Sequence, residues 1–336
     1  MAKTIYLTKP GRLSRKDNTL KFQPTGEDGE PLGKPKILPI KNVSDIFCLS
    51  QHDFNSSLFN FLGQQSIQLH CFDYYGNYTG TYCPRDYLQA GQVRIQQTQA
   101  YLEPTRRLRI AQRFVAGALL NIRQNLKYYQ NRGKDLQQIL QAIEQAHENI
   151  PHAQDIEELM GIEGNMRLLY YTGWETILGG HLKFGHRSRQ PPHNELNALI
   201  SFANSLCYVQ CLKALYHTQL DPTISYLHQP GYRRYSLALD LAEIFKPLLA
   251  DRLIFQLVNR RQITQTSFQP AMGGTLLRES ARITFLRAWD ERLNQTIKHR
   301  ELNRKISYQQ LVRLEGYKLV KHLLGIKTYT PFKIWW

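Results

Sequence analysis

The spacing of apolar residues changes near Pro84, and this change constrains the fold more than any other feature of the sequence. Before Pro84, Ile67, Leu69 and Cys71 alternate with residues of the opposite face. A turn over residues 74–77 then leads into a second short run. Alternation interrupted by a turn is typical of a β-hairpin. We therefore expect short strands in the first part of the chain.

From about Arg106 onward the apolar residues follow a helical period. Leu108, Val115, Leu119 and Ile122 form one stripe with helical spacing, which predicts an amphipathic helix. Further helical patterns follow as far as residue 324. The sequence therefore predicts an α+β protein. A small N-terminal β-rich domain over residues 1–86 precedes a larger all-α C-terminal domain over residues 87–336.

The charge of the chain favours an anionic partner. Lys and Arg number 43 and Asp and Glu 27, which gives a formal net charge of +16. Such an excess is most simply explained by nucleic acid. Between residues 103 and 134 there are eight Lys or Arg and one acidic residue; this face can track phosphates or be an ordinary solvated surface. The candidate nucleic-acid contacts are Arg106, Arg109, Arg113, Arg123, Arg187, Arg189, Arg233 and Arg234.

The sequence also bears on the cellular compartment. Its beginning is polar and basic, without the apolar core of a signal peptide. No apolar run reaches the roughly 18 residues that a membrane span needs. The five cysteines are odd in number and have no paired spacing, which favours reduced thiols. Cys207 and Cys211 lack a second ligand pair, so we expect core residues there. We expect a cytoplasmic protein that does not contact a membrane.

The stretch from Tyr226 to Pro247 carries the clearest chemical pattern. Its sequence is YLHQPGYRRYSLALDLAEIFKP. Asp240 and Glu243 share one face of a predicted helix because they are three residues apart. Ser236 is expected to cap that helix. His228 precedes it in a loop, and a loop histidine near helical carboxylates suits a hard metal ion. A histidine that is merely hydrogen-bonded beside an exposed acidic face fits the same pattern.

Glu163 is a third candidate ligand. It lies within the helical pattern of residues 155–171 and is followed by Gly164. A glycine inside a helix is unfavourable by roughly 1 kcal/mol relative to Ala, which suggests that something approaches closely there. Glu163, His228 and Glu243 together suit Mn²⁺ or Mg²⁺ rather than a thiolate zinc site. The 65 residues between Glu163 and His228 give no independent support for this grouping.

Three segments resemble one known family, the CRISPR-associated adaptation integrase or "Cas-one" nuclease. The segments are GIEGNMRLLYY, RSRQPPHNELNALISFANSLCY and YLHQPGYRRYSLALDLAEIFKP. The resemblance extends to the β-rich start and to the Tyr-x-Pro-Phe pattern that begins at Tyr329. The chain departs from the family pattern at Met166, Tyr171 and Lys246. The lysine puts in doubt any bidentate contact that an arginine would make there.

The resemblance implies a function. Glu163, His228 and Glu243 match the family's metal ligands for Mg²⁺ or Mn²⁺, and Asp240 matches an additional catalytic acidic residue. Asp240 would bind a second ion, orient a ligand or take a proton. The implied activity is metal-dependent DNA cleavage and strand transfer, in which a 3′-hydroxyl of a captured fragment attacks a CRISPR array.

The resemblance also implies partners. They are double-stranded and branched DNA, a second copy of the chain bound largely through the β-rich domain, and a small "Cas-two" dimer that bridges two such dimers. One alternative is a non-enzymatic basic DNA-binding scaffold, which the positive charge alone would support. Another is an RNA-processing nuclease.

Overall fold

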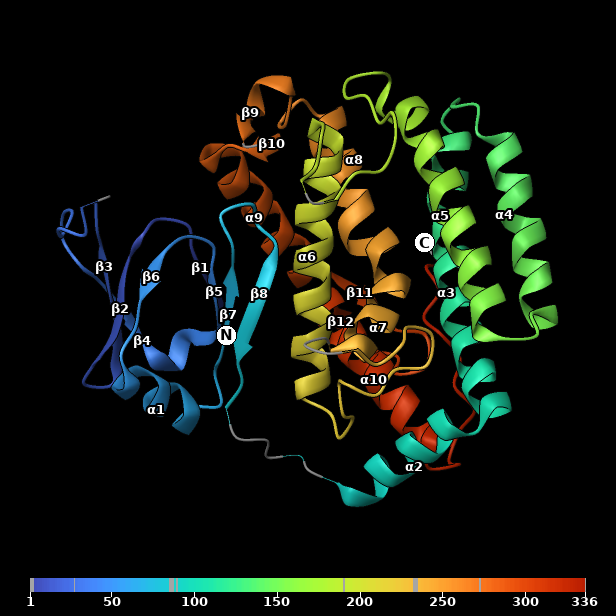
Figure 1. Ribbon diagram of the computed structural model, residues 1–336, viewed down its shortest axis with the longest axis horizontal. Coiled ribbons are helices and arrows are strands. Elements are labelled where there is room, and N and C mark those ends of the chain that lie inside the picture. The colour runs from blue at the N-terminus through green and yellow to red at the C-terminus, as the bar shows by residue number, and fades with distance from the viewer. Residues whose placement is uncertain are drawn as a thin grey trace. The chain divides into compact units, whose positions relative to one another are not determined.

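A computed structural model describes residues 3–26, 28–84, 88, 90–189, 191–231, 235–271 and 273–335. The chain divides into two compact units, residues 1–87 and 88–336 (Figure 1). The first unit is rich in strands and the second is mostly helical. The predicted α+β class, with strands before helices, is confirmed.

The described residues of the N-terminal unit form two four-stranded sheets and one α-helix. One sheet has the strand order β1-β5-β7-β8 and the other β4-β3-β2-β6. In the first sheet β1, β5 and β7 run parallel, and β8 pairs antiparallel with β7. The bounds are β1 Lys3–Leu7, β2 Gly11–Lys16, β3 Thr19–Pro24, β4 Lys36–Pro39, β5 Val43–Cys48, β6 His52–Asp53, α1 Ser56–Gln64, β7 Gln68–Phe72 and β8 Tyr78–Tyr82.

The expected hairpin before Pro84 is formed by β7 and β8. Leu69 pairs with Tyr82 across the two strands. Ile67 and Leu69 are buried, as the alternation predicts, and they join one hydrophobic core with residues of β2, β3, β5 and α1. His70, predicted on the opposite face, is buried as well. The strand is therefore covered on both faces, which alternation alone does not indicate.

The C-terminal unit is a helical assembly with two small hairpins. The helices are α2 Gly91–Leu102, α3 Pro104–Gln130, α4 Gln137–Asn149, α5 Ile156–Leu178, α6 Glu195–Tyr216, α7 Ser236–Lys246, α8 Arg252–Asn259, α9 Glu279–Asn294 and α10 Tyr308–Leu323. The hairpins pair β9 Phe268–Ala271 with β10 Gly274–Leu277, and β11 Thr296–Lys298 with β12 Lys305–Ser307. The expectation of an all-α domain is therefore corrected to a mostly helical one.

Helix α6 lies in the core of this unit. Cys207 and Cys211 on it are buried and unpaired, as expected of core residues. By length and composition α6 is apolar enough to cross a membrane, and it is the one such helix among the described residues. However, 78% of its apolar window is buried inside the protein, as in the core helix of a globular protein.

The ends of α5 and α7 follow from their local sequences. The Asp155 side chain caps α5 by accepting from the backbone N–H of Glu158 at 2.8 Å, which satisfies a donor that the helix leaves open. Helix α7 ends at Lys246 and continues into a π-helical turn, Pro247–Asp251. Pro247 explains this irregularity, because proline has no backbone N–H to donate to the regular hydrogen-bond pattern. These two helices carry the candidate metal ligands.

Candidate metal centre

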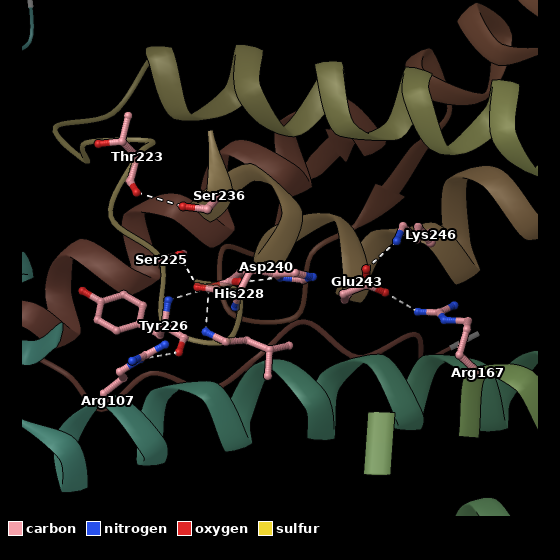
Figure 2. A network of polar contacts seen from close by, with 11 residues as sticks. Arg107, Arg167, Thr223, Ser225, Tyr226, His228, Ser236, Asp240, Glu243 and Lys246 are labelled. Atoms are coloured by element: carbon pink, nitrogen blue, oxygen red, sulfur yellow. Dashed lines mark hydrogen bonds and ion pairs between the residues drawn. The ribbon is translucent and has the colours of Figure 1, made fainter. Parts of the chain in front are cut away.

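His228 is held in one orientation by Asp240. It lies in the loop before α7, and its Nδ1 is 2.8 Å from Asp240 Oδ1. Asp240 is fully buried. Its carboxylate also accepts hydrogen bonds from the backbone N–H groups of residues 226, 227 and 228, at 2.7, 3.1 and 3.0 Å (Figure 2). One carboxylate therefore fixes both the loop backbone and the imidazole ring, leaving Nε2 as the nitrogen that is not bound to Asp240.

This arrangement is the one that metal-binding histidines generally use. A ligand histidine donates its other ring nitrogen to a carboxylate, which sets the tautomer and the ring direction. Of the three roles that the sequence leaves open for Asp240, orienting a ligand fits these contacts best. Its two oxygens are already engaged and buried. Ser236 does not cap α7 as expected: it is the first residue of the helix and donates to the Thr223 carbonyl at 2.8 Å.

A buried arginine joins the two glutamates. Arg167 lies on α5, one helical turn after Glu163, and its Nε is 3.4 Å from Glu163 Oε1. Its Nη2 is 2.5 Å from Oε2 of Glu243 on α7 (Figure 2). Lys246, which follows Glu243 by three residues, also forms an ion pair with it. The carboxylates of two helices are thus connected through one guanidinium group.

The pKa values of the two glutamates shift in opposite directions. Burial would raise the pKa of Glu243, but the positive charges of Lys246 and Arg167 outweigh it, so that pKa is lowered. Burial and the neighbouring charge of Glu243 raise the pKa of Glu163. Burial alone would lower the pKa of His228, but its hydrogen bond to Asp240 raises it instead. The charges of Glu243 and His228 both act on the pKa of Glu163, and these two residues also act on the pKa of each other, so the three groups belong to one site.

The donor set fits a hard divalent ion in its chemistry. Two carboxylates and one imidazole are ligands that Mg²⁺ and Mn²⁺ accept. A divalent ion would also relieve the repulsion that raises the pKa of Glu163. In the side-chain positions seen here, no three acidic, histidine or cysteine residues of the described chain are arranged as ligands. Glu243 instead holds Arg167 and Lys246, so coordination requires these side chains to turn.

The chain resembles known proteins over most of its length. The sequence model of the family "CRISPR associated protein Cas1" matches residues 5–291. The chain belongs to the Cas1 family. It is 44% identical to the CRISPR-associated endonuclease Cas1 of Fusobacterium nucleatum, over 100% of this chain and 98% of that protein. Family membership makes the chain an endonuclease of CRISPR adaptation.

Solved structures share the fold. A CAS1 protein from Thermotoga maritima is 35% identical and superposes with a TM-score of 0.85, covering 98% of this chain and 100% of its own. A casposase bound to its integration product also superposes with a TM-score of 0.85, covering 98% of this chain and 92% of its own. At 17% identity that likeness concerns the fold alone.

Several arginines that we predicted to contact nucleic acid have partners within the protein. Arg106 and Arg113 donate to the carbonyls of Leu323 and Tyr329. Arg123 pairs with Glu144 at 2.6 Å. Two of these partners lie more than two hundred residues away in the sequence, so one helix alone does not reveal them. Contact of these three arginines with nucleic acid stays a prediction.

Of the remaining predicted contacts, one arginine is bound within the protein and two are exposed. Arg187 donates to the Asn197 side chain at 2.9 Å and to the Ser201 hydroxyl at 3.1 Å, so it supports the loop before α6. Arg109, on α3, and Arg189 are exposed and remain candidate DNA contacts. Arg233 and Arg234 lie outside the described residues.

Sequence reasoning missed Arg167, the cation between the two glutamates. A signal for it existed, because Glu163 and Arg167 have the i, i+4 spacing of helical ion pairs. It also missed Asp251, which is 2% exposed. Burial raises the pKa of Asp251 to about 7, against the charges of Arg167 and Lys246. Gly164 was expected to accommodate a close neighbour, but a Cβ there would meet no protein atom within 4 Å. The helix surface beside Glu163 is therefore open.

Proposed function

We propose that this chain performs metal-dependent cleavage and strand transfer of DNA, and that it inserts captured fragments into a CRISPR array. The observation that carries the proposal is the set formed by Glu163, Glu243 and His228, with Asp240 orienting the histidine. Bound Mg²⁺ or Mn²⁺ would polarise a phosphoryl oxygen and stabilise charge on the attacking or leaving oxygen. The three residues would hold that ion.

The chain's own groups prepare this site. Lys246 and Arg167 keep Glu243 ionised, because their positive charges lower its pKa, and an ionised carboxylate is the form that binds a hard cation. Asp240 keeps Nδ1 of His228 engaged, so Nε2 is the nitrogen offered to the ion. His228 must be neutral to bind it. The surface beside Glu163 is open at Gly164, which leaves room for a phosphodiester to approach.

We further propose the partners that the family likeness implies. Double-stranded and branched DNA suits the net charge of +16. A homodimer formed through the β-rich unit would be bridged to a second one by a small Cas-two dimer. A cytoplasmic location suits the five cysteines, none of which forms a disulfide. A purely non-enzymatic scaffold is not favoured, because the full-length relative is named an endonuclease.

The test is a metal titration of cleavage and strand transfer on branched DNA, with DNA binding followed in parallel. Glu243→Gln retains size and helix propensity but removes the charge that a hard cation needs. We expect it to abolish Mn²⁺- and Mg²⁺-dependent activity while DNA binding stays nearly intact. Glu163→Gln and His228→Ala should behave in the same way. Full activity in Glu243→Gln would refute the proposed site, whereas equal loss of DNA binding and activity would indicate misfolding.

A further inference from the structure

The last part of the chain borders a cavity in the helical unit. Its volume is about 530 Å³, and its walls come from α10, the loop after β11 and the segment Lys327–Trp335. None of the residues that line it belongs to the candidate metal centre. The volume lies within the range of about 300–1,000 Å³ that is usual for small-ligand pockets.

Buried side chains fix the backbone of the segment Lys327–Trp335. Oε1 of Glu315, which is 1% exposed, accepts from the Tyr329 hydroxyl at 2.7 Å and from the Phe332 N–H at 2.8 Å. Asn121 on α3 donates to the Phe332 carbonyl at 3.1 Å and accepts from the Ile334 N–H at 2.8 Å. The segment therefore has a defined position, and its side chains point in defined directions.

Alternate residues of the segment differ in exposure, although all four of its last residues line the cavity. Phe332 and Ile334 are buried, whereas Lys333 is exposed and Trp335 is half-buried. The Trp335 ring meets the edge of Phe332 at a centroid distance of 5.7 Å. The guanidinium of Arg300 lies 5.4 Å from its ring centroid. The cavity thus has an aromatic wall next to positive charge.

The charges that line the cavity do not balance. Five are positive and two are negative. Lys318 pairs with Glu315 at 2.9 Å, and Lys327 pairs with Glu301 at 3.2 Å. The positive groups that remain, with no carboxylate partner among the described residues, are Arg300, Lys321 and Lys333. Cations gathered in a concave wall attract and concentrate anions.

We propose that this cavity binds a nucleotide unit of an unpaired nucleic-acid strand. Lys321, Lys333 and Arg300 would contact its phosphates, and the base would lie against Trp335. The aromatic wall favours an unpaired strand over a duplex, because side chains stack on bases only where these are unstacked and splayed out. The proposal rests on the proposed function, since it assumes that DNA is the substrate, and it adds a strand-binding site apart from the metal centre.

The test measures binding of fluorescent oligo-dT and of a blunt duplex to the full chain in EDTA, over a range of salt. Binding without divalent metal does not depend on the metal centre, so failure here is distinguishable from failure of the proposed function. Lys321→Gln/Lys333→Gln should weaken oligo-dT binding and flatten the log–log salt slope by about 1.4, since each single-strand contact contributes about 0.7. Duplex binding should change less.

Two further variants test whether a base stacks on Trp335 and whether the effect of charge removal is specific to the cavity. Trp335→Ala should weaken oligo-dT binding by about 5- to 160-fold, as the loss of one stacked base does, and Trp335→Phe should restore most of it. The matched control is Lys298→Gln/Lys305→Gln, which removes two exposed lysines that face each other in the neighbouring hairpin but do not line the cavity. Thermal melting confirms that each variant is folded.

Three results would overturn the proposal. The first is an equal effect of the control and the cavity variants, which would show general surface charge only. The second is an equal loss of duplex and oligo-dT binding in Lys321→Gln/Lys333→Gln. The third is binding of free dTMP without measurable binding of the oligonucleotide, which would assign the cavity to a free nucleotide.

Discussion

Replacing Asp240 by Asn changes one atom at the centre of the site. The wild-type carboxylate accepts four hydrogen bonds, two on each oxygen. An asparagine has one oxygen and one NH₂ group. In either orientation the NH₂ faces two hydrogen-bond donors of the loop before α7. One of the two pairs of hydrogen bonds is therefore lost, although the side chain still fits.

The magnitude follows from these contacts. A hydrogen bond to a charged group contributes about 1.5–3 kcal/mol, so losing two destabilises the protein by about 3 kcal/mol or more. For a unit of this size, about 2–4 °C in Tm corresponds to each kcal/mol, which predicts a fall of about 6–12 °C. Loss of a carboxylate that supports a metal ligand typically weakens metal binding about 10- to 100-fold. Activity should then recover at saturating metal.

The pH dependence provides a separate readout. In the wild type the hydrogen bond to Asp240 raises the pKa of His228 against the effect of burial. Protonated histidine cannot bind a metal ion, so wild-type affinity should be lost as the pH falls through this raised pKa. Asp240→Asn removes the charge that raises the pKa, and burial then lowers it. The midpoint of the metal-binding pH profile should therefore move to lower pH in the variant.

The assay combines Mn²⁺ titration calorimetry at several pH values with thermal melting in EDTA. Glu315→Gln is the matched control, because Glu315 is another buried carboxylate that accepts several hydrogen bonds but lies outside the metal centre. It should lower Tm without changing Mn²⁺ affinity. Unchanged affinity and an unchanged pH midpoint in Asp240→Asn would refute the orienting role, as would the same loss of affinity in Glu315→Gln.

Two further substitutions test the surroundings of the glutamates. Arg167→Met should destabilise the protein by about 3–5 kcal/mol, since it leaves Glu163 without its ion-pair partner and buried Glu243 with Lys246 alone. Mn²⁺ should raise the Tm of Arg167→Met more than the Tm of the wild type. The control is Arg292→Met, because Arg292 is a buried arginine with neutral partners. An equal rise in Tm in the two variants would contradict the role of Arg167 between the two glutamates. Gly164→Ala and Gly161→Ala should each stabilise α5 by up to about 1 kcal/mol, but only the former should weaken branched-DNA cleavage. Equal activity of the two would show that DNA does not approach beside Glu163.

Much of the architecture can be predicted from local patterns. The change in apolar spacing near Pro84 separates strands from helices, because side chains on one face recur with a different spacing in each backbone conformation. Short elements are harder to predict: the helical patterns of the sequence include residues 276–298, but the structure has β10, α9 and β11 there. Strands of three or four residues give too few positions for a period to show. Such short strands form because each one pairs with the other strand of its hairpin.

The basic face of α3 shows why one helix alone does not reveal the partners of its side chains. Judged from one helix, its arginines lie off the apolar stripe and are expected to face solvent. In the folded unit the C-terminal segment passes beside α3, and its carbonyls accept from Arg113. Gly117 permits this approach, since a Cβ there would lie 2.7 Å from Pro331. Only the packing of segments more than two hundred residues apart decides which cations remain exposed.

Some contacts of the metal centre can be predicted from the sequence, and others cannot. The pairs Glu163–Arg167 and Glu243–Lys246 are each readable from sequence, because they have helical ion-pair spacing. The contact between Arg167 and Glu243 is not readable, because it joins two helices that only the packing of α5 and α7 brings together. That contact gives Glu243 two cations and leaves Glu163 with one weaker partner, so their pKa values separate. Sequence patterns therefore identify the candidate ligands, whereas the protonation state of each ligand is set by tertiary structure.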